Sequence, residues 1–294
     1  MRAISRLANN IRRQLDPRKE SEAQRAMSGY KANTMFSSPA KTTSASIHTA
    51  MKGPLHSARV EPKPSPPSTM LDALDPVQVK LLKEECILVD EADKVVGTGS
   101  KEDCHLMSNI NKGLLHRAFS VFLFNSKGEL LIQQRSDAKI TFPGSYTNSC
   151  CSHPLAVPTE QTEDPVQGVK VAAQRRIFAE LGIPTEELPL ECFHYITRIK
   201  YMAASDGMWG EHEVDYILFV KKDIKIMKPD PNEIKTIRYL KRNDIKEFVS
   251  EIEDRGEKLT PWFQLILNTF LEEWWSNLDN LKKFESHDQI HKLN

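Results

Sequence analysis

The stretch from Trp209 to Val220 constrains the fold more than any other part of the chain. It begins with Trp-Gly-Glu-His-Glu and runs directly into Val214–Val220, whose β-branched and aromatic residues predict a strand. Side chains alternate between the two faces of a strand, so Glu211 and Glu213 should point the same way. A helix would place them nearly opposite. Two same-facing carboxylates, with histidines elsewhere in the chain, are ligands that a divalent metal prefers.

Helices are expected on both sides of the predicted strands. One helix should begin at Asp164-Pro165, where an N-cap residue precedes proline, and end at Gly182; Thr260-Pro261 opens another, to residue 277, with the same signature. The segment 136–155 is predicted to be a loop. Further strands are expected at residues 86–89, 95–97, 114–124, 129–135, 193–202 and 234–240, and further helices at 77–82 and 243–253. This arrangement favours an α/β/α sandwich with a mixed sheet.

The first 70 residues have a different composition from the remainder. They hold 12 Lys/Arg against four acids, a net charge of +8, so the rest of this neutral chain carries −8. Because the segment is rich in Ser, Thr and Pro and poor in apolar clusters, we expect residues 1–70 to be a disordered basic extension before a folded domain at 71–294.

The extreme N-terminus indicates a possible targeting peptide. Residues 1–15 combine arginines with apolar residues at helical spacing and have no acid before Asp16, which resembles a mitochondrial presequence. A solvated basic tail, or leader sequence before a start at Met51 or Met70, explains the same composition. We therefore expect a mitochondrial or a cytoplasmic protein. A peroxisomal one is less favoured, because the C-terminal residues match that signal only with a shift of one position.

Three histidines add to the two carboxylates. A lone histidine in a strand, such as His116, is more often a hydrogen-bonded core residue than a ligand. Taken together, the set suits five- or six-coordinate Mg²⁺, Mn²⁺ or Zn²⁺, provided that the fold brings it together. The set comprises His105, His116, His153, Glu211 and Glu213.

Three cations lie close to these residues in the sequence. Arg135 and Lys139 are four residues apart just after a predicted strand, and Lys101 precedes His105 by four. They are either solvated surface charges or a binding site for a diphosphate, whose several negative charges require more than one cation.

The helix that ends at Gly182 partly matches a Nudix box, a motif whose acids hold Mg²⁺ against a diphosphate. Arg175, Glu180 and Gly182 agree with the motif, as do two apolar residues. The other positions, which in the motif are Gly and three acids, are here Gln161, Gln167, Arg176 and Ala179. Loss of these acids argues against ordinary Nudix hydrolysis and favours different chemistry on the same scaffold.

Four segments closely resemble the type 1 isopentenyl-diphosphate isomerases, which have a Nudix fold. These segments are 114–122, 133–136, the Thr-Asn-Ser-Cys-Cys-Ser-His-Pro block at 147–154 and the Trp-Gly-Glu-His-Glu block at 209–213. The likeness covers roughly residues 72–293. It implies a Nudix-type α/β/α sandwich that converts isopentenyl diphosphate to dimethylallyl diphosphate through a tertiary carbocation.

The resemblance also implies a role for individual residues. The catalytic pair falls on Cys151 and Glu213, and the metal ligands on the three histidines, Glu211 and Glu213, with Glu180 at a second Mg²⁺ position. The substrate contacts fall on Lys101, Arg135, Lys139, Ser152, Arg176, Tyr201 and Trp262. Without the resemblance, Trp262 would be interpreted as a core residue.

We therefore expect an isomerase with Mg²⁺ as cofactor and Mn²⁺ or Zn²⁺ as alternatives at the His/Glu site. Its partner is expected to be a small-molecule diphosphate, with no nucleic acid and no membrane span, and the protein is expected to be a monomer. The main alternative is a Nudix-type diphosphohydrolase with the same fold and metal, in which water attacks phosphorus.

Overall fold

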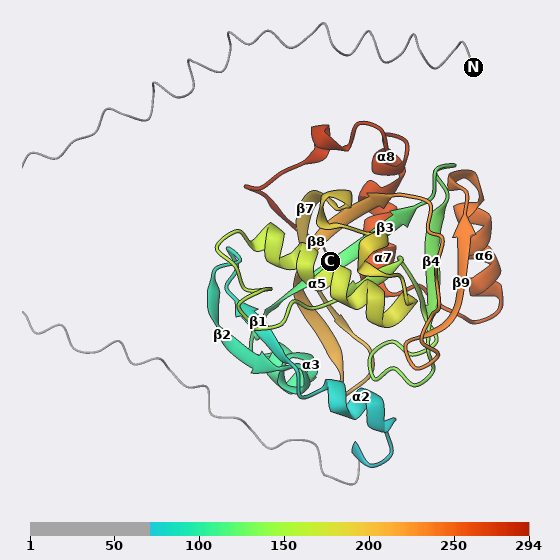
Figure 1. The fold of residues 1–294 in the computed structure, drawn as a ribbon. Helices are drawn as coiled ribbons and strands as arrows, with labels where there is room; N and C mark the ends of the chain where they lie inside the picture. The colour runs from blue at the N-terminus through green and yellow to red at the C-terminus, as the bar shows by residue number, and fades with distance from the viewer. Residues whose placement is uncertain (1–70, 294) are drawn as a thin grey trace, which may run out of the picture. The chain divides into compact units, whose positions relative to one another are not determined.

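A mixed sheet forms the centre of residues 71–293, the part of the chain that the computed structural model describes (Figure 1). Its main path follows the order β10-β7-β8-β3-β1-β2. The pair β3–β8 and the pair β10–β7 are parallel, whereas β7–β8 and β1–β2 are antiparallel. The strands are β1 (Glu85–Val89), β2 (Val95–Ser100), β3 (His116–Phe124), β4 (Leu130–Arg135), β5 (Tyr146–Thr147), β6 (Cys150–Ser152), β7 (His194–Ala204), β8 (Gly210–Lys221), β9 (Ile234–Leu240) and β10 (Ile290–Lys292).

Helices cover both faces of this sheet (Figure 1). The Asp164 side chain caps α5 by accepting a hydrogen bond from the backbone N–H of Val166 at 3.0 Å, and Gly182 ends that helix at a φ of 64°. A left-handed residue at this position is common because glycine adopts it without steric cost. The helices are α2 (Pro76–Leu81), α3 (Lys101–His105), α4 (Met107–Ile110), α5 (Pro165–Leu181), α6 (Ile245–Asp254), α7 (Pro261–Ile266) and α8 (Glu272–Trp275), with a π-helical segment at Leu267–Leu271.

Two hydrophobic cores lie on opposite faces of the sheet. Alternate residues of β8 separate between them: Leu218 packs beneath α5, whereas Phe219 packs against the helices α6 to α8. The same alternation holds along β3, where Val121 and Phe122 face different cores. The predicted α/β/α sandwich with a mixed sheet is confirmed.

The prediction of a loop over residues 136–155 was wrong in part. Tyr146–Thr147 and Cys150–Ser152 are short strands, and β6 pairs with β3 so that Cys151 is opposite Ser120 and Cys150 opposite Val121. The segment was interpreted as a loop because its Pro and Gly residues hide two strands of only two and three residues. The strand that follows Trp209 also begins earlier than predicted, at Gly210, so both glutamates lie inside it.

The predictions for the extension at residues 1–70, including the targeting peptide, fall outside the described residues. Within residues 71–293, each helix falls short of the length and apolar character needed to span a membrane.

Candidate active site

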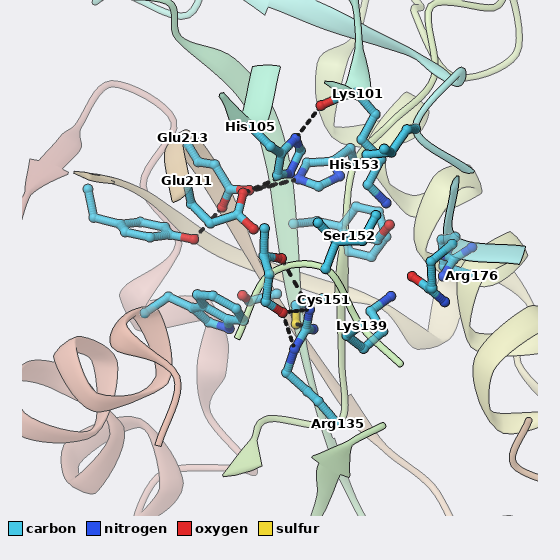
Figure 2. Close-up of a pocket in the computed structure, with 18 residues that line it drawn as sticks. Lys101, His105, Arg135, Lys139, Cys151, Ser152, His153, Arg176, Glu211 and Glu213 are labelled. Atoms are coloured by element: carbon cyan, nitrogen blue, oxygen red, sulfur yellow. Dashed lines mark hydrogen bonds and ion pairs between the residues drawn. The ribbon is translucent and has the colours of Figure 1, made fainter. Parts of the chain in front are cut away.

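A pocket opens where β3, β6 and β8 meet α3, α5 and α7. Of the residues that the sequence pointed to, His116 and Glu180 lie just behind its wall, and the others line it. Figure 2 shows the His and Glu side chains on one side of the pocket and Lys139 and Arg176 on the other. The lining residues from the predicted set are Lys101, His105, Arg135, Lys139, Cys151, Ser152, His153, Arg176, Tyr201, Glu211, Glu213 and Trp262.

Five buried ligand atoms converge at one end of this pocket. They come from His105, His116, His153, Glu211 and Glu213, and all lie within 4.8 Å of one another. The sheet register explains part of this convergence, because His116 at the start of β3 is directly opposite Glu213 on β8. His105 ends the short helix α3, and His153 follows β6 directly.

The hydrogen bonds of this cluster leave several of its ligand atoms without a partner. His105 Nδ1 lies 2.6 Å from the backbone carbonyl of Lys101, which can only accept, so Nδ1 carries the proton and Nε2 presents a lone pair. His105 Nε2 lies 2.8 Å from Glu211 Oε2, yet among the described residues neither atom has a hydrogen-bond partner of acceptable geometry. Nε2 of His116 also lacks a hydrogen-bond partner among the described residues.

Buried polar atoms without partners are rare in folded proteins. Here they point toward a shared centre and come from imidazoles and carboxylates, which are ligands of divalent cations. The residues present therefore fit a divalent metal ion, and removal of such an ion would leave this pattern of unpaired atoms.

The two adjacent cysteines point to different sides of the sheet. Cys150 is fully buried in the core beneath α5, whereas Cys151 packs on the other face and lines the pocket. Burial raises the pKa of Cys151 to about 12, although the nearby Arg135 guanidinium opposes the shift. In the absence of substrate, Cys151 is therefore a neutral thiol at neutral pH. Its sulfur lies 3.9 Å from the Thr147 hydroxyl and 4.0 Å from Arg135 Nη1.

Glu213 lines the same pocket as Cys151. Its two oxygens are held separately: His153 Nε2 lies 2.7 Å from Oε1, and the Tyr201 hydroxyl donates to Oε2 at 2.5 Å. Although burial opposes ionisation, the His116 imidazole holds the pKa of Glu213 below its ordinary value. The pocket thus combines a neutral thiol with an ionised carboxylate.

Four cations line the pocket, and two of them share a buried acid. Lys139 Nζ lies 2.5 Å from Glu233 Oε2, and Arg176 Nη2 lies 3.3 Å from Glu233 Oε1. Arg176 also pairs with Glu180 at 2.9 Å within α5. Glu180 is therefore close to the cationic wall and is not one of the five convergent ligands.

Trp262 faces this pocket from the start of α7. Its indole N–H donates to the side-chain oxygen of Asn148 at 3.0 Å, which fixes the orientation of the ring. Tyr201 and Phe142 lie beside it, with ring centroids 6.1 and 5.4 Å from the indole. One wall of the pocket is thus aromatic and apolar.

Comparison with known proteins identifies the family. A family model of the NUDIX domain matches residues 114–263. "Isopentenyl-diphosphate Delta-isomerase 1" of Mesocricetus auratus is 58% identical over 220 residues, which cover 75% of this chain and 96% of that protein. The protein of the same name from Bos taurus is 55% identical over 227 residues, covering 77% and 100%. The chain belongs to the isopentenyl-diphosphate Delta-isomerase family. A fungal member from Gibberella zeae is 52% identical over 230 residues, covering 77% of this chain and 89% of that protein.

Helix α5, which partly matches the Nudix box, differs from that motif in the side chains that it presents to the pocket. Arg175 forms an ion pair with Glu160 at 2.6 Å, outside the pocket lining. Arg176 occupies a position where the motif has an acid, and its guanidinium lines the pocket. The helix therefore contributes a cation to the site where the motif would contribute a carboxylate.

Sequence reasoning missed three buried residues that support the site. Asn148 orients Trp262, Thr147 contacts the Cys151 sulfur, and Glu233 holds Lys139 and Arg176. The first two lie inside the Thr-Asn-Ser-Cys-Cys block, so their proximity to Cys151 was a usable signal. Glu233 is 94 residues from Lys139, and no local pattern connects them.

Proposed function

We propose that this protein interconverts isopentenyl diphosphate and dimethylallyl diphosphate, with Cys151 and Glu213 as the acid–base pair. The observation that carries the proposal is that a thiol and a carboxylate face one pocket whose other walls are cationic and aromatic. The family to which the chain belongs supports the same reaction.

The reaction explains why two proton-transfer groups are needed. Moving the double bond requires a proton added at one carbon and another removed two carbons away. An allylic C–H is too weakly acidic for a side chain to ionise directly. Protonation of the alkene first gives a tertiary carbocation, whose neighbouring C–H is readily lost. One member of the pair donates and the other accepts, and the roles exchange in the reverse direction.

The aromatic wall suits the cationic intermediate. The face of an indole attracts a cation by roughly 2 kcal/mol or more when water is excluded. The ring of Trp262 offers no nucleophile that would trap the cation, and the hydrogen bond from its N–H to Asn148 prevents it from rotating away. Substrate cation and indole can therefore remain in contact throughout the reaction.

The four cations of the pocket suit the diphosphate group, and one of them, Arg135, lies with its guanidinium carbon 5.7 Å from the Trp262 ring centroid. Lys101, Arg135, Lys139 and Arg176 all line the pocket, and Ser152 adds a hydroxyl at its edge. Guanidinium and ammonium groups bind phosphate oxygens by charge-assisted hydrogen bonds. We propose that they anchor the diphosphate so that the hydrocarbon end lies between Cys151 and Glu213.

For the metal, we propose Mg²⁺ at the five-ligand cluster, with Mn²⁺ and Zn²⁺ as alternatives, and Glu180 beside a second Mg²⁺ that accompanies the diphosphate. A cation at the cluster would withdraw charge from Glu213 and fix its position. The three histidines, Glu211 and Glu213 would hold the ion. Metal analysis of the purified protein identifies the occupant.

Incubation with isopentenyl diphosphate in deuterated water tests the function. We expect dimethylallyl diphosphate that carries deuterium in a methyl group, because the added proton comes from a group that exchanges with solvent. The diphosphate should remain intact. Release of phosphate without isomerised product would instead indicate the diphosphohydrolase.

A further inference from the structure

Glu233 is a buried acid in a wall that should bind an anion. It lies in the turn before β9, and its side chain is 7% exposed. Its carboxylate is absent from the pocket lining, whereas its partners Lys139 and Arg176 both line the pocket. The acid therefore contacts the two cations from behind.

Both oxygens of Glu233 contact polar groups of the protein. Oε2 accepts from Lys139 Nζ at 2.5 Å, and Oε1 lies 3.3 Å from Arg176 Nη2 and accepts from the Gln78 side-chain amide at 3.3 Å. The backbone carbonyl of Glu233 also accepts from the Ser136 N–H at 3.0 Å. The turn of Glu233 is thus attached to the loop that carries Lys139.

The charges around Lys139 show why it needs this acid. Its ammonium group is largely buried, with 10% of the side chain exposed. Burial lowers the pKa of Lys139 to about 8; Glu233 and Glu180 oppose this shift, while Arg135 and Lys101 add to it. Without Glu233, the pKa would fall further and the lysine would lose its proton near neutral pH.

We propose that Glu233 is a positioning residue of the diphosphate site: from behind the wall it holds Lys139, and secondarily Arg176, in place and charged for the substrate. This inference rests on the proposed function. An ammonium group has three donors, so one bond to Glu233 leaves two for phosphate oxygens. The acid lies behind the wall, and so it supports the diphosphate and does not compete with it.

The test compares Glu233→Gln with wild-type full-length protein. Glutamine keeps the shape and one acceptor oxygen but removes the charge. We expect the Kd for inorganic pyrophosphate and the KM for isopentenyl diphosphate to rise about tenfold, the factor expected for loss of one charge-assisted hydrogen bond. The kcat should stay within about twofold of wild type. The matched control is Glu251→Gln, which removes an exposed acid 3.9 Å from Arg238 and should change neither constant.

The pH profile separates this role from a merely structural one. The ratio of variant to wild-type Kd cancels the titration of pyrophosphate itself. Near pH 6, Lys139 is protonated in both proteins, so we expect the ratio of the variant Kd to the wild-type Kd to be close to 1. The ratio should increase toward pH 8. Glu233→Asp, which retains the charge, should restore part of the affinity and the wild-type profile.

If Glu233→Gln does not fold, Lys139→Met with and without Glu233→Gln gives the same information. Removal of both members of a buried pair is tolerated better than removal of one. The second change should then alter the Kd by no more than about twofold, because most of its effect passes through Lys139. An unchanged Kd in Glu233→Gln, a lower Kd, or a full tenfold effect in the Lys139→Met background would overturn the proposal. A wild-type protein that binds pyrophosphate but does not isomerise would refute only the proposed function.

Discussion

Two buried charged clusters lie back to back on the same strands. On one face of the sheet, where β3 carries His116 and β8 carries Glu211 and Glu213, the three histidines and two glutamates converge. On the other face, at the neighbouring positions, Arg117, Arg198 and Tyr216 surround Asp93. Adjacent residues of a strand point to opposite faces, so His116 and Arg117 belong to different clusters although they are consecutive.

The clusters differ in how their polar atoms are paired. Asp93 Oδ1 accepts from Arg117 at 2.9 Å, and Oδ2 accepts from Arg198 at 3.0 Å and from the Tyr216 hydroxyl. In the His/Glu cluster, by contrast, atoms such as His105 Nε2 and Glu211 Oε2 lack a hydrogen-bond partner in the part of the chain described. Protein groups alone satisfy the Asp93 carboxylate, and Arg198 Nε, which has no partner among the described residues, is a donor that cannot bind a cation. The unpaired atoms of the His/Glu cluster instead fit a divalent metal ion, which the protein alone does not supply.

The largest predicted effect is a loss of turnover when residues of the convergent cluster and its pocket are replaced. Glu213→Gln and Cys151→Ala should each lower kcat by about 10³-fold or more, because each removes a group that transfers a proton. Thermal denaturation should show a folded protein in both cases, since glutamine keeps the shape and one acceptor oxygen of Glu213, and Cys151→Ala removes only a sulfur atom that lines the pocket. Isomerisation of isopentenyl diphosphate is the assay.

Cys150→Ala is the matched control for this prediction. Cys150 lies in the core beneath α5 and makes no contribution to the pocket lining, so the variant should retain most activity. An inactive Cys150→Ala with an active Cys151→Ala would show that the wrong cysteine has been assigned.

The sequence predicted the part of the His/Glu cluster that depends on local periodicity. Same-facing Glu211 and Glu213 follow from the strand period. What the sequence could not predict is the meeting of distant elements. Asp93 contacts Tyr216 over a separation of 123 residues, and His153 meets Glu213 over 60. Those contacts depend on strand order and register, which the family resemblance supplied for the site residues alone.

The next effect is on stability in the paired cluster. Asp93→Asn should destabilise the fold by about 3–5 kcal/mol, because it leaves the buried Arg117 guanidinium without its counter-charge. Asparagine has the same shape and tolerates the φ of 63° at this position, so the change isolates the charge. Chemical denaturation measures the loss, and kcat of the folded protein should stay within about twofold of wild type.

Glu91→Gln is the exposed counterpart of this substitution. Glu91 pairs with Lys200 at 2.6 Å, but its side chain is 60% exposed, and such pairs contribute only about 0–1 kcal/mol. A loss in Asp93→Asn no larger than in Glu91→Gln would mean that complete pairing does not distinguish the two clusters.

The smallest predicted effect is a gain in stability when the convergent cluster binds a metal ion. A ligand that binds only the folded state stabilises it by RT ln(1 + [L]/Kd), or about 2.7 kcal/mol at a concentration of 100 times Kd. Mn²⁺ or Mg²⁺ should therefore raise the Tm of metal-free protein, and a chelator should reverse both this rise and the isomerase activity. Glu211→Gln should reduce the metal-dependent rise, because Glu211 Oε2 is one of the convergent atoms. Asp93→Asn should start from a lower Tm but show the same metal-dependent increment, since its cluster has no ligand atom left to offer. If the two variants lost the increment equally, the metal would be acting on the whole fold and not at the His/Glu cluster.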